Sequence, residues 1–67
     1  MDYGRNGDKV LSVEDIGHNE AIVRVINQGG VPYTAIWKGD MEVASTPTVG
    51  EKRMIDWWKR EGWRATT

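Results

Sequence analysis

Hydrophobic residues follow two different periods along this chain, and the change of period divides it into a strand region and a helix. From residue 9 to residue 44, apolar residues come in short runs separated by glycine, asparagine and proline. From residue 51 to residue 58 they recur at the three- and four-residue spacing of an amphipathic helix. Short runs bounded by turn residues are typical of β-strands, so the sequence predicts strands first and one helix last.

The segment 12–28 permits two interpretations. It could be a helix that opens on a Ser12…Asp15 cap and ends at the glycine pair after residue 28. Its apolar residues, however, scatter around a helical wheel and define no face. Gly17 in the middle of a helix would also cost about 1 kcal/mol. The β-branched run 22–26 favours a strand, and we therefore expect strands throughout this segment.

The strand region predicts a β-meander of antiparallel hairpins. Turn residues stand at 17–19, at 27–30 and at 39–40, where glycine in the first position is typical of a type II′ turn. A proline before the third run lacks an N–H and suits a strand start or an edge. The expected strands are Lys9–Glu14, Ala21–Ile26, Tyr33–Lys38 and Met41–Ala44.

The C-terminal helix has a recognisable start and end. Thr48 and Glu51 have the spacing of a capping box; alternatively, Thr46 is the cap and a proline occupies the first helical position. Gly62 suits a left-handed residue that ends the helix, which would bring Trp63 against Trp58. Four apolar residues share one arc of the helix opposite the charged ones: Met54, Ile55, Trp57 and Trp58.

One helix covers only one face of a sheet, yet the run 22–26 is apolar on both faces. Tyr33 and Trp37 lie four residues apart and therefore share a strand face. The second face must be covered by curling of the sheet into a barrel, by the N-terminal segment or by another molecule. If it is uncovered, Tyr33 and Trp37 form a contact surface.

The segment from Tyr33 to Gly39 resembles the Tyr-x-x-x-Trp-Lys-Gly strand of chromodomains. The resemblance implies a curled antiparallel sheet with a C-terminal helix, and in that family the tryptophan contributes to an aromatic cage for methylated lysine. Asp40 stands where a second cage aromatic is expected, so we carry over the topology and not the ligand. The expected fold is α+β: a curled meander of three to four strands, SH3-like or chromodomain-like if it closes into a barrel, with one C-terminal α-helix packed on it.

Length and composition predict one small domain, residues 9–67, after a flexible N-terminal lead-in of residues 1–8. The chain has 67 residues and no cysteine, which excludes disulfides and thiolate metal sites. No apolar run reaches the roughly 20 residues of a membrane span, and the N-terminus lacks the pattern of a signal peptide. We therefore expect a cytoplasmic protein with no membrane partner.

The net charge argues against a dedicated duplex-DNA binder, and the lack of catalytic motifs argues against an enzyme. The formal net charge is −1, whereas a dedicated duplex-DNA binder is usually strongly basic. The single histidine, His18, stands in a turn without further metal ligands or an orienting partner. The chain also lacks a phosphate-binding glycine loop. We expect no catalytic residue, no cofactor and no metal.

The high tryptophan content indicates a binding function, because tryptophan and tyrosine are frequent at interface hot spots. The sequence predicts a non-enzymatic protein-interaction module, including one that self-associates, of the kind a virus or mobile element uses as an accessory or inhibitor protein. The alternative is a nucleic-acid binder of modest affinity that stacks bases on Tyr33 and Trp37. The candidate interaction surface comprises Tyr33, Trp37, Trp57, Arg24 and Lys38. Candidate contacts to phosphates or an acidic partner are Lys52, Arg53, Lys59, Arg60 and Arg64.

Overall fold

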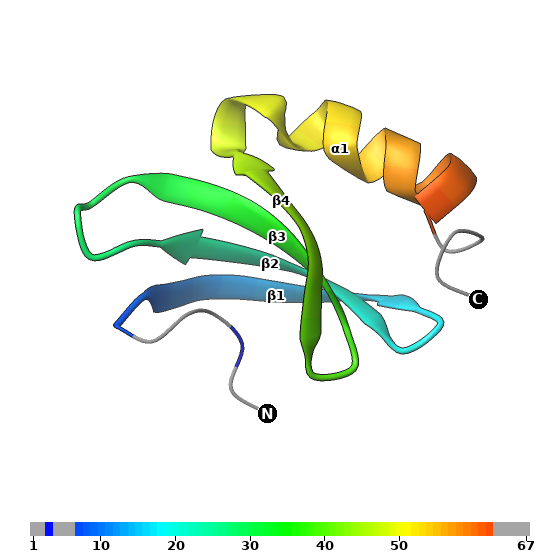
Figure 1. Ribbon diagram of the computed structural model, residues 1–67, viewed down its shortest axis with the longest axis horizontal. Helices are drawn as coiled ribbons and strands as arrows, with labels where there is room; N and C mark the ends of the chain where they lie inside the picture. Colours follow the sequence, from blue (N-terminus) through cyan, green and yellow to red (C-terminus); the bar gives the residue numbers. More distant parts are fainter. Residues whose placement is uncertain (1–2, 4–6, 63–67) are drawn as a thin grey trace.

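The computed structural model describes Tyr3 and residues 7–62, which form a four-stranded antiparallel sheet followed by a helical segment (Figure 1). Each strand pairs with its neighbours in sequence order, as expected for a meander. The predicted α+β arrangement is confirmed, and strands occupy the segment in which a helix was the alternative. The strands are β1 (Lys9–Gly17), β2 (Glu20–Ile26), β3 (Pro32–Lys38) and β4 (Met41–Pro47).

The three turns use the residues that the sequence singled out. His18 and Asn19 have φ values of 57° and 62°, the two left-handed residues of a type I′ turn between β1 and β2. Gly39, at φ 63°, fits the type II′ turn expected between β3 and β4. In the longer turn, the Asn27 side-chain oxygen accepts hydrogen bonds from the N–H groups of Gly29 and Val31, each 2.9 Å long. Local hydrogen bonds thus set the register of the hairpins.

The sheet curls strongly without closing into a barrel (Figure 1). Register shifts place one extra residue in β1 at Leu11, another at Ile16, and one in β4 at Val43. Such bulges bend a strand and increase its right-handed twist. Within the described part of the chain, β1 pairs only with β2 and β4 only with β3, so both are edge strands. Of the three ways to cover the second face, barrel closure does not occur.

The core has one layer on each face of the sheet. On the face away from the helix, Trp37 packs with four small aliphatic residues, and Tyr3 and Tyr33 lie against this cluster. The Tyr3 and Trp37 rings meet edge to face, with centroids 5.5 Å apart and planes at 77°. Tyr3, near the start of the sequence, therefore helps to cover this face. The remaining members of the cluster are Ala21, Val23, Val25 and Ala35.

The helical segment has three parts: a 3₁₀ turn η1 (Thr48–Gly50), the α-helix α1 (Glu51–Trp57) and a π-helical end η2 (Trp58–Gly62). Neither predicted cap is present, because no side chain caps the start of η1 or of α1. Pro47 ends β4 with φ −54° and ψ 148° instead of opening a helix. The capping-box prediction is wrong because the carboxylate of Glu51 bonds to the sheet.

The end of the helical segment also differs from the expectation. Gly62 does not adopt the left-handed conformation, so the predicted glycine cap is wrong. A Cβ at this position would collide with the indole of Trp58, and this close approach is the physical reason for glycine here. Trp58 is 2% exposed. The proposed contact between Trp58 and Trp63 lies outside the described residues.

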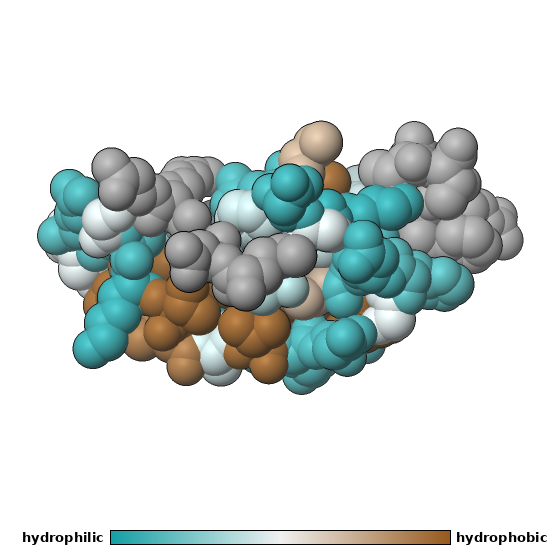
Figure 2. All heavy atoms as spheres, turned by 90° about the horizontal axis from the view of Figure 1, so that it is seen from below, coloured by the Kyte–Doolittle hydropathy of each residue, from teal (hydrophilic) through white to brown (hydrophobic). Residues whose placement is uncertain are grey.

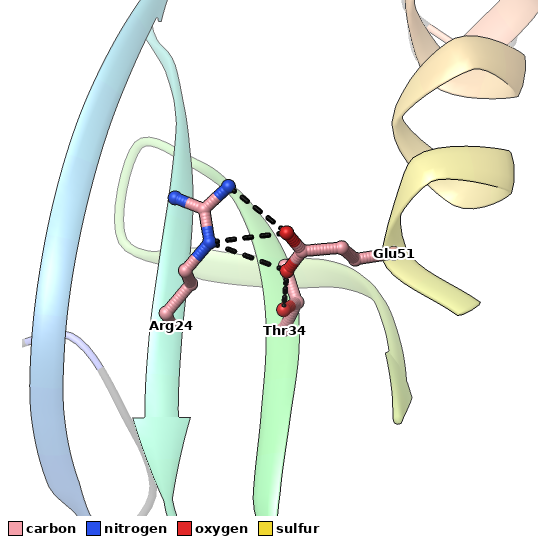
Figure 3. A network of polar contacts seen from close by, with 3 residues as sticks. All are labelled: Arg24, Thr34 and Glu51. Carbon is pink, nitrogen blue, oxygen red and sulfur yellow. Dashed lines mark hydrogen bonds and ion pairs between the residues drawn. The ribbon is translucent and has the colours of Figure 1, made fainter. Parts of the chain in front are cut away.

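A polar network fastens the start of α1 to the helix-facing side of the sheet (Figure 3). The Arg24 guanidinium on β2 donates to both carboxylate oxygens of Glu51 at 3.1–3.2 Å. The hydroxyl of Thr34, on the neighbouring strand β3, donates to the same carboxylate. Arg24 and Thr34 are opposite one another in the β2–β3 register, so Glu51 bridges two strands. This network fixes where the helix begins relative to the sheet.

Candidate interaction surface

β1 combines an unpaired sheet edge with exposed apolar side chains. β1 pairs with β2 on one side, and no described strand pairs with its other side. Val10, Leu11 and Val13 on this strand are 36%, 55% and 49% exposed. Seen from below, hydrophobic side chains gather on the side of the molecule where β1 lies (Figure 2). A strand with free backbone groups and apolar side chains is a ready template for pairing with another chain.

The two faces of β1 carry different chemistry. Val10 and Val13 are opposite the core residues Val25 and Val23, so they extend the core cluster outward to the edge. The other face of the strand is polar and contains Lys9, Ser12 and Glu14, which are opposite Ile26, Arg24 and Ile22 of β2. The edge is thus apolar on one face and carries charges of both signs on the other.

The aromatic pair predicted as a contact surface is largely engaged within the chain. Trp37 is 9% exposed and belongs to the core cluster beneath Tyr3. Tyr33 is half-buried, and its hydroxyl donates a 2.7 Å hydrogen bond to the carboxylate of Asp8. A partner that bound the rings of Tyr33 and Trp37 would first have to displace Tyr3 and Asp8.

The other three candidate residues have separate environments. Arg24 is bound to Glu51, and these hydrogen bonds raise the pKa of its guanidinium. Lys38 is partly buried at the end of β3, opposite Glu20 of β2. Trp57 is 40% exposed on α1, with its ring centroid 5.7 Å from that of Trp58. Of the five predicted surface residues, Trp57 therefore presents the most accessible ring.

The basic residues of the helical segment lie mostly in solvent. Lys52 forms a 3.4 Å ion pair with Asp56 one turn later, and the two side chains are 92% and 58% exposed. Arg53, Lys59 and Arg60 are exposed. Arg64 lies outside the described residues. Exposed ion pairs of this type contribute little to stability, about 0.3–0.5 kcal/mol, so the fold does not depend on the Lys52–Asp56 pair.

Two further observations concern the described part of the chain, Tyr3 and residues 7–62. No group of three or more histidine, aspartate or glutamate side chains is placed there to hold a metal ion. None of the described helices is long and apolar enough to cross a membrane.

Comparisons with known proteins give no relative for this chain. No family model matches it, and no curated protein or solved structure is similar enough to count as a match. The resemblance to the chromodomain strand therefore stays a resemblance over seven residues.

Sequence reasoning overlooked the β1 edge and two members of the polar network. The signal for the edge was present: Val10, Leu11 and Val13 alternate imperfectly with polar residues in the first strand. The predicted meander already makes the first strand an edge strand, but the sequence did not indicate that its apolar side chains would stay exposed. Thr34 and Glu51 are 17 residues apart, and their pairing depends on how the helix crosses the sheet.

Proposed function

We propose that the protein is a non-enzymatic interaction module that self-associates through the edge of β1. The observation that carries this proposal is the exposure of Val10, Leu11 and Val13 on a nine-residue strand with one unpaired side. Soluble proteins usually protect such an edge with charges, a proline or a covering loop. On β1, charged side chains protect only one face of the edge, and Val10 and Val13 leave the other face apolar.

A second copy of the same strand fits this edge. With a two-fold axis at Ser12, antiparallel pairing places Val13 of each copy opposite the Val10–Leu11 bulge of the other. Because the bulge adds one residue, Lys9 then lies opposite Glu14 of the second copy. The β1–β2 register places Lys9 and Glu14 on the same face of the sheet, and two residues must share a face to form a cross-strand pair. Apolar residues thus meet apolar residues, and opposite charges meet each other.

The expected affinity is modest. Stable interfaces bury about 1,200–2,000 Å² in total, and a single strand edge supplies only part of that area. The bulges at Leu11 and Ile16 also twist the strand and limit the length over which two copies can pair. We therefore expect a reversible dimer that forms at a protein concentration on the order of 100 μM rather than an obligate one.

Sedimentation velocity of two valine variants tests the proposal. Val13→Lys places a charge at the centre of the proposed interface and should abolish the dimer at every concentration up to about 500 μM. Val49→Lys is the matched control. Val49 is 98% exposed and lies in η1, after the end of β4 and outside the proposed interface. This variant should dimerise like the wild type. A wild-type protein that stays monomeric, or two variants with equal behaviour, would contradict the proposal.

The alternative function, nucleic-acid binding, has less support from the geometry. Base stacking on Trp37 would require its release from the core cluster, and Arg24 is already paired with Glu51. Among the described residues, the exposed cations of the helical segment and Lys9 on β1 are available for phosphate contacts. Titration of single-stranded DNA at low salt, followed by tryptophan fluorescence, tests this alternative, which predicts quenching that salt reverses.

A further inference from the structure

A partly open cavity of about 210 Å³ lies between the β1–β2 turn and the end of the helical segment. Both of these elements lie on the right of the molecule in Figure 1. The strand side of the cavity is formed by Ile16, His18 and Glu20, and the helix side by Trp58 and Lys59. The cavity is separate from the exposed apolar residues of β1.

Two buried polar atoms of the residues that line this cavity have no hydrogen-bond partner in the described structure. Glu20 is only 4% exposed, and its Oε2 atom accepts no hydrogen bond. The indole Nε1 of Trp58, which is 2% exposed, donates none. Buried polar atoms are nearly always paired, and an unpaired carboxylate oxygen is among the most costly exceptions. The cavity therefore has the chemistry to accept a polar guest, and the charge of Glu20 favours a cation.

We propose that this cavity binds a primary ammonium group, carried either by a small amine or by a lysine side chain of a partner. An ammonium N–H can donate a charge-assisted hydrogen bond to Oε2 of Glu20. Ile16 offers an apolar contact for a short alkyl chain. The volume admits a chain of a few carbons. The proposal does not depend on self-association through β1.

The hydrogen bond to Glu20 distinguishes this site from a purely aromatic cation cage. A quaternary ammonium ion has the same charge but no N–H, so it would leave Oε2 of Glu20 unpaired. Primary ammonium ions should therefore bind at least tenfold more tightly than tetramethylammonium. Lys59 also lines the cavity, and no described ion pair joins it to Glu20. Its positive charge opposes a cationic guest, so Lys59→Met should strengthen binding severalfold.

Nuclear magnetic resonance of the tryptophan indole N–H groups tests the site directly. The Trp58 indole signal is assigned by its disappearance in Trp58→Phe. n-Propylammonium chloride should then shift this signal saturably in the wild type, whereas potassium chloride at equal ionic strength should not. Glu20→Gln should weaken binding at least tenfold. Asp56→Asn, the same carboxylate-to-amide change at an exposed position of α1 that does not line the cavity, serves as the matched control and should bind like the wild type.

A lysine-containing tripeptide with blocked ends separates the two sources of the ammonium group. Tighter binding of the peptide indicates a partner's lysine, and tighter binding of the free amine indicates a small molecule. If Glu20→Gln does not fold, the melting temperature of the wild type supplies the evidence, since propylammonium should raise it relative to potassium at the same concentration. A non-saturating shift, an equal shift with potassium, or equal affinity for tetramethylammonium would overturn the proposal.

Discussion

Replacement of Glu51 by alanine is the most informative test of how the helix is fastened to the sheet. The substitution removes the acceptor of every hydrogen bond in the Arg24–Glu51–Thr34 network. Thr34 is 0% exposed, so its hydroxyl would stay buried without its partner. Arg24 has a side chain that is 35% exposed and can turn toward water. Loss of Glu51 therefore costs more at the buried Thr34 hydroxyl than at the partly exposed Arg24 guanidinium.

The loss of stability in Glu51→Ala can be estimated from the exposed fractions of Thr34 and Arg24. A buried hydroxyl that loses its partner costs about 1–3 kcal/mol. The ion pair with the partly exposed Arg24 contributes at most about 1 kcal/mol, because solvent screens it. The free energy of unfolding should therefore fall by about 1–4 kcal/mol in Glu51→Ala. Small domains have only about 0.05–0.15 kcal/mol of stability per residue, so this loss is a large fraction of the total.

Urea denaturation followed by tryptophan fluorescence measures this change. The control is Asp56→Ala on the same helix, which breaks only the exposed pair with Lys52 and should cost less than about 0.5 kcal/mol. Thr34→Val in the Glu51→Ala background should restore part of the loss, because it removes the unpaired hydroxyl. A Glu51→Ala protein within about 0.5 kcal/mol of the wild type would refute the reasoning, as would additivity of the Thr34 and Glu51 substitutions.

The same network predicts a pH dependence of stability. The hydrogen bond from Thr34, followed by that from Arg24, lowers the pKa of Glu51 below its ordinary value. The network therefore stabilises the fold fully above the unfolded-state pKa of about 4.3, and this contribution is lost as the pH falls through the lowered folded-state pKa. The difference in unfolding free energy between the wild type and Glu51→Gln should be constant from pH 6 to 8 and shrink below about pH 4. An undiminished difference at pH 3 would contradict the assignment.

Two further substitutions test the packing. Gly62→Ala should destabilise the fold by about 1–3 kcal/mol in urea denaturation, because the new methyl group collides with the Trp58 indole. Gly29→Ala, in the open turn before β3, should be tolerated, and equal costs at the two glycines would contradict this packing. Trp37→Ala removes the largest side chain of the core cluster and should cost about 3–5 kcal/mol, enough to unfold much of the protein as judged by circular dichroism. A stable, folded Trp37→Ala protein would mean that Trp37 serves binding rather than the core.

Local sequence patterns sufficed to predict the strands and turns. The β-branched run of β2 and the glycine at the start of the β3–β4 turn each specify their conformation through nearby residues alone. The predicted first and fourth strands ended too early. β4 continues through Ser45 and Thr46 because these polar residues pair with Ala35 and Thr34, and only the assembled sheet supplies that partner.

The features that sequence analysis missed depend on contacts between distant residues. Glu51 has the spacing of a helix cap. Once the helix crosses the sheet, however, Arg24 and Thr34 lie within reach, and the carboxylate of Glu51 accepts hydrogen bonds from them instead of from the backbone at the helix start. Gly62 looks like a left-handed helix end, yet its role is to let the chain pass close to Trp58. The candidate surface at Trp37 likewise depends on Tyr3, which is 34 positions earlier in the chain.

Amide hydrogen exchange at increasing protein concentration tests the central claim, self-association through the β1 edge, most directly. The outward-facing amides of β1 have no partner strand among residues 7–62, so they should exchange fast when the protein is dilute. At several hundred micromolar, the amides around Ser12 and Val13 should become protected, while those of β4, the other edge strand, should not change. Protection that is independent of concentration, or that increases only at β4, would contradict the account.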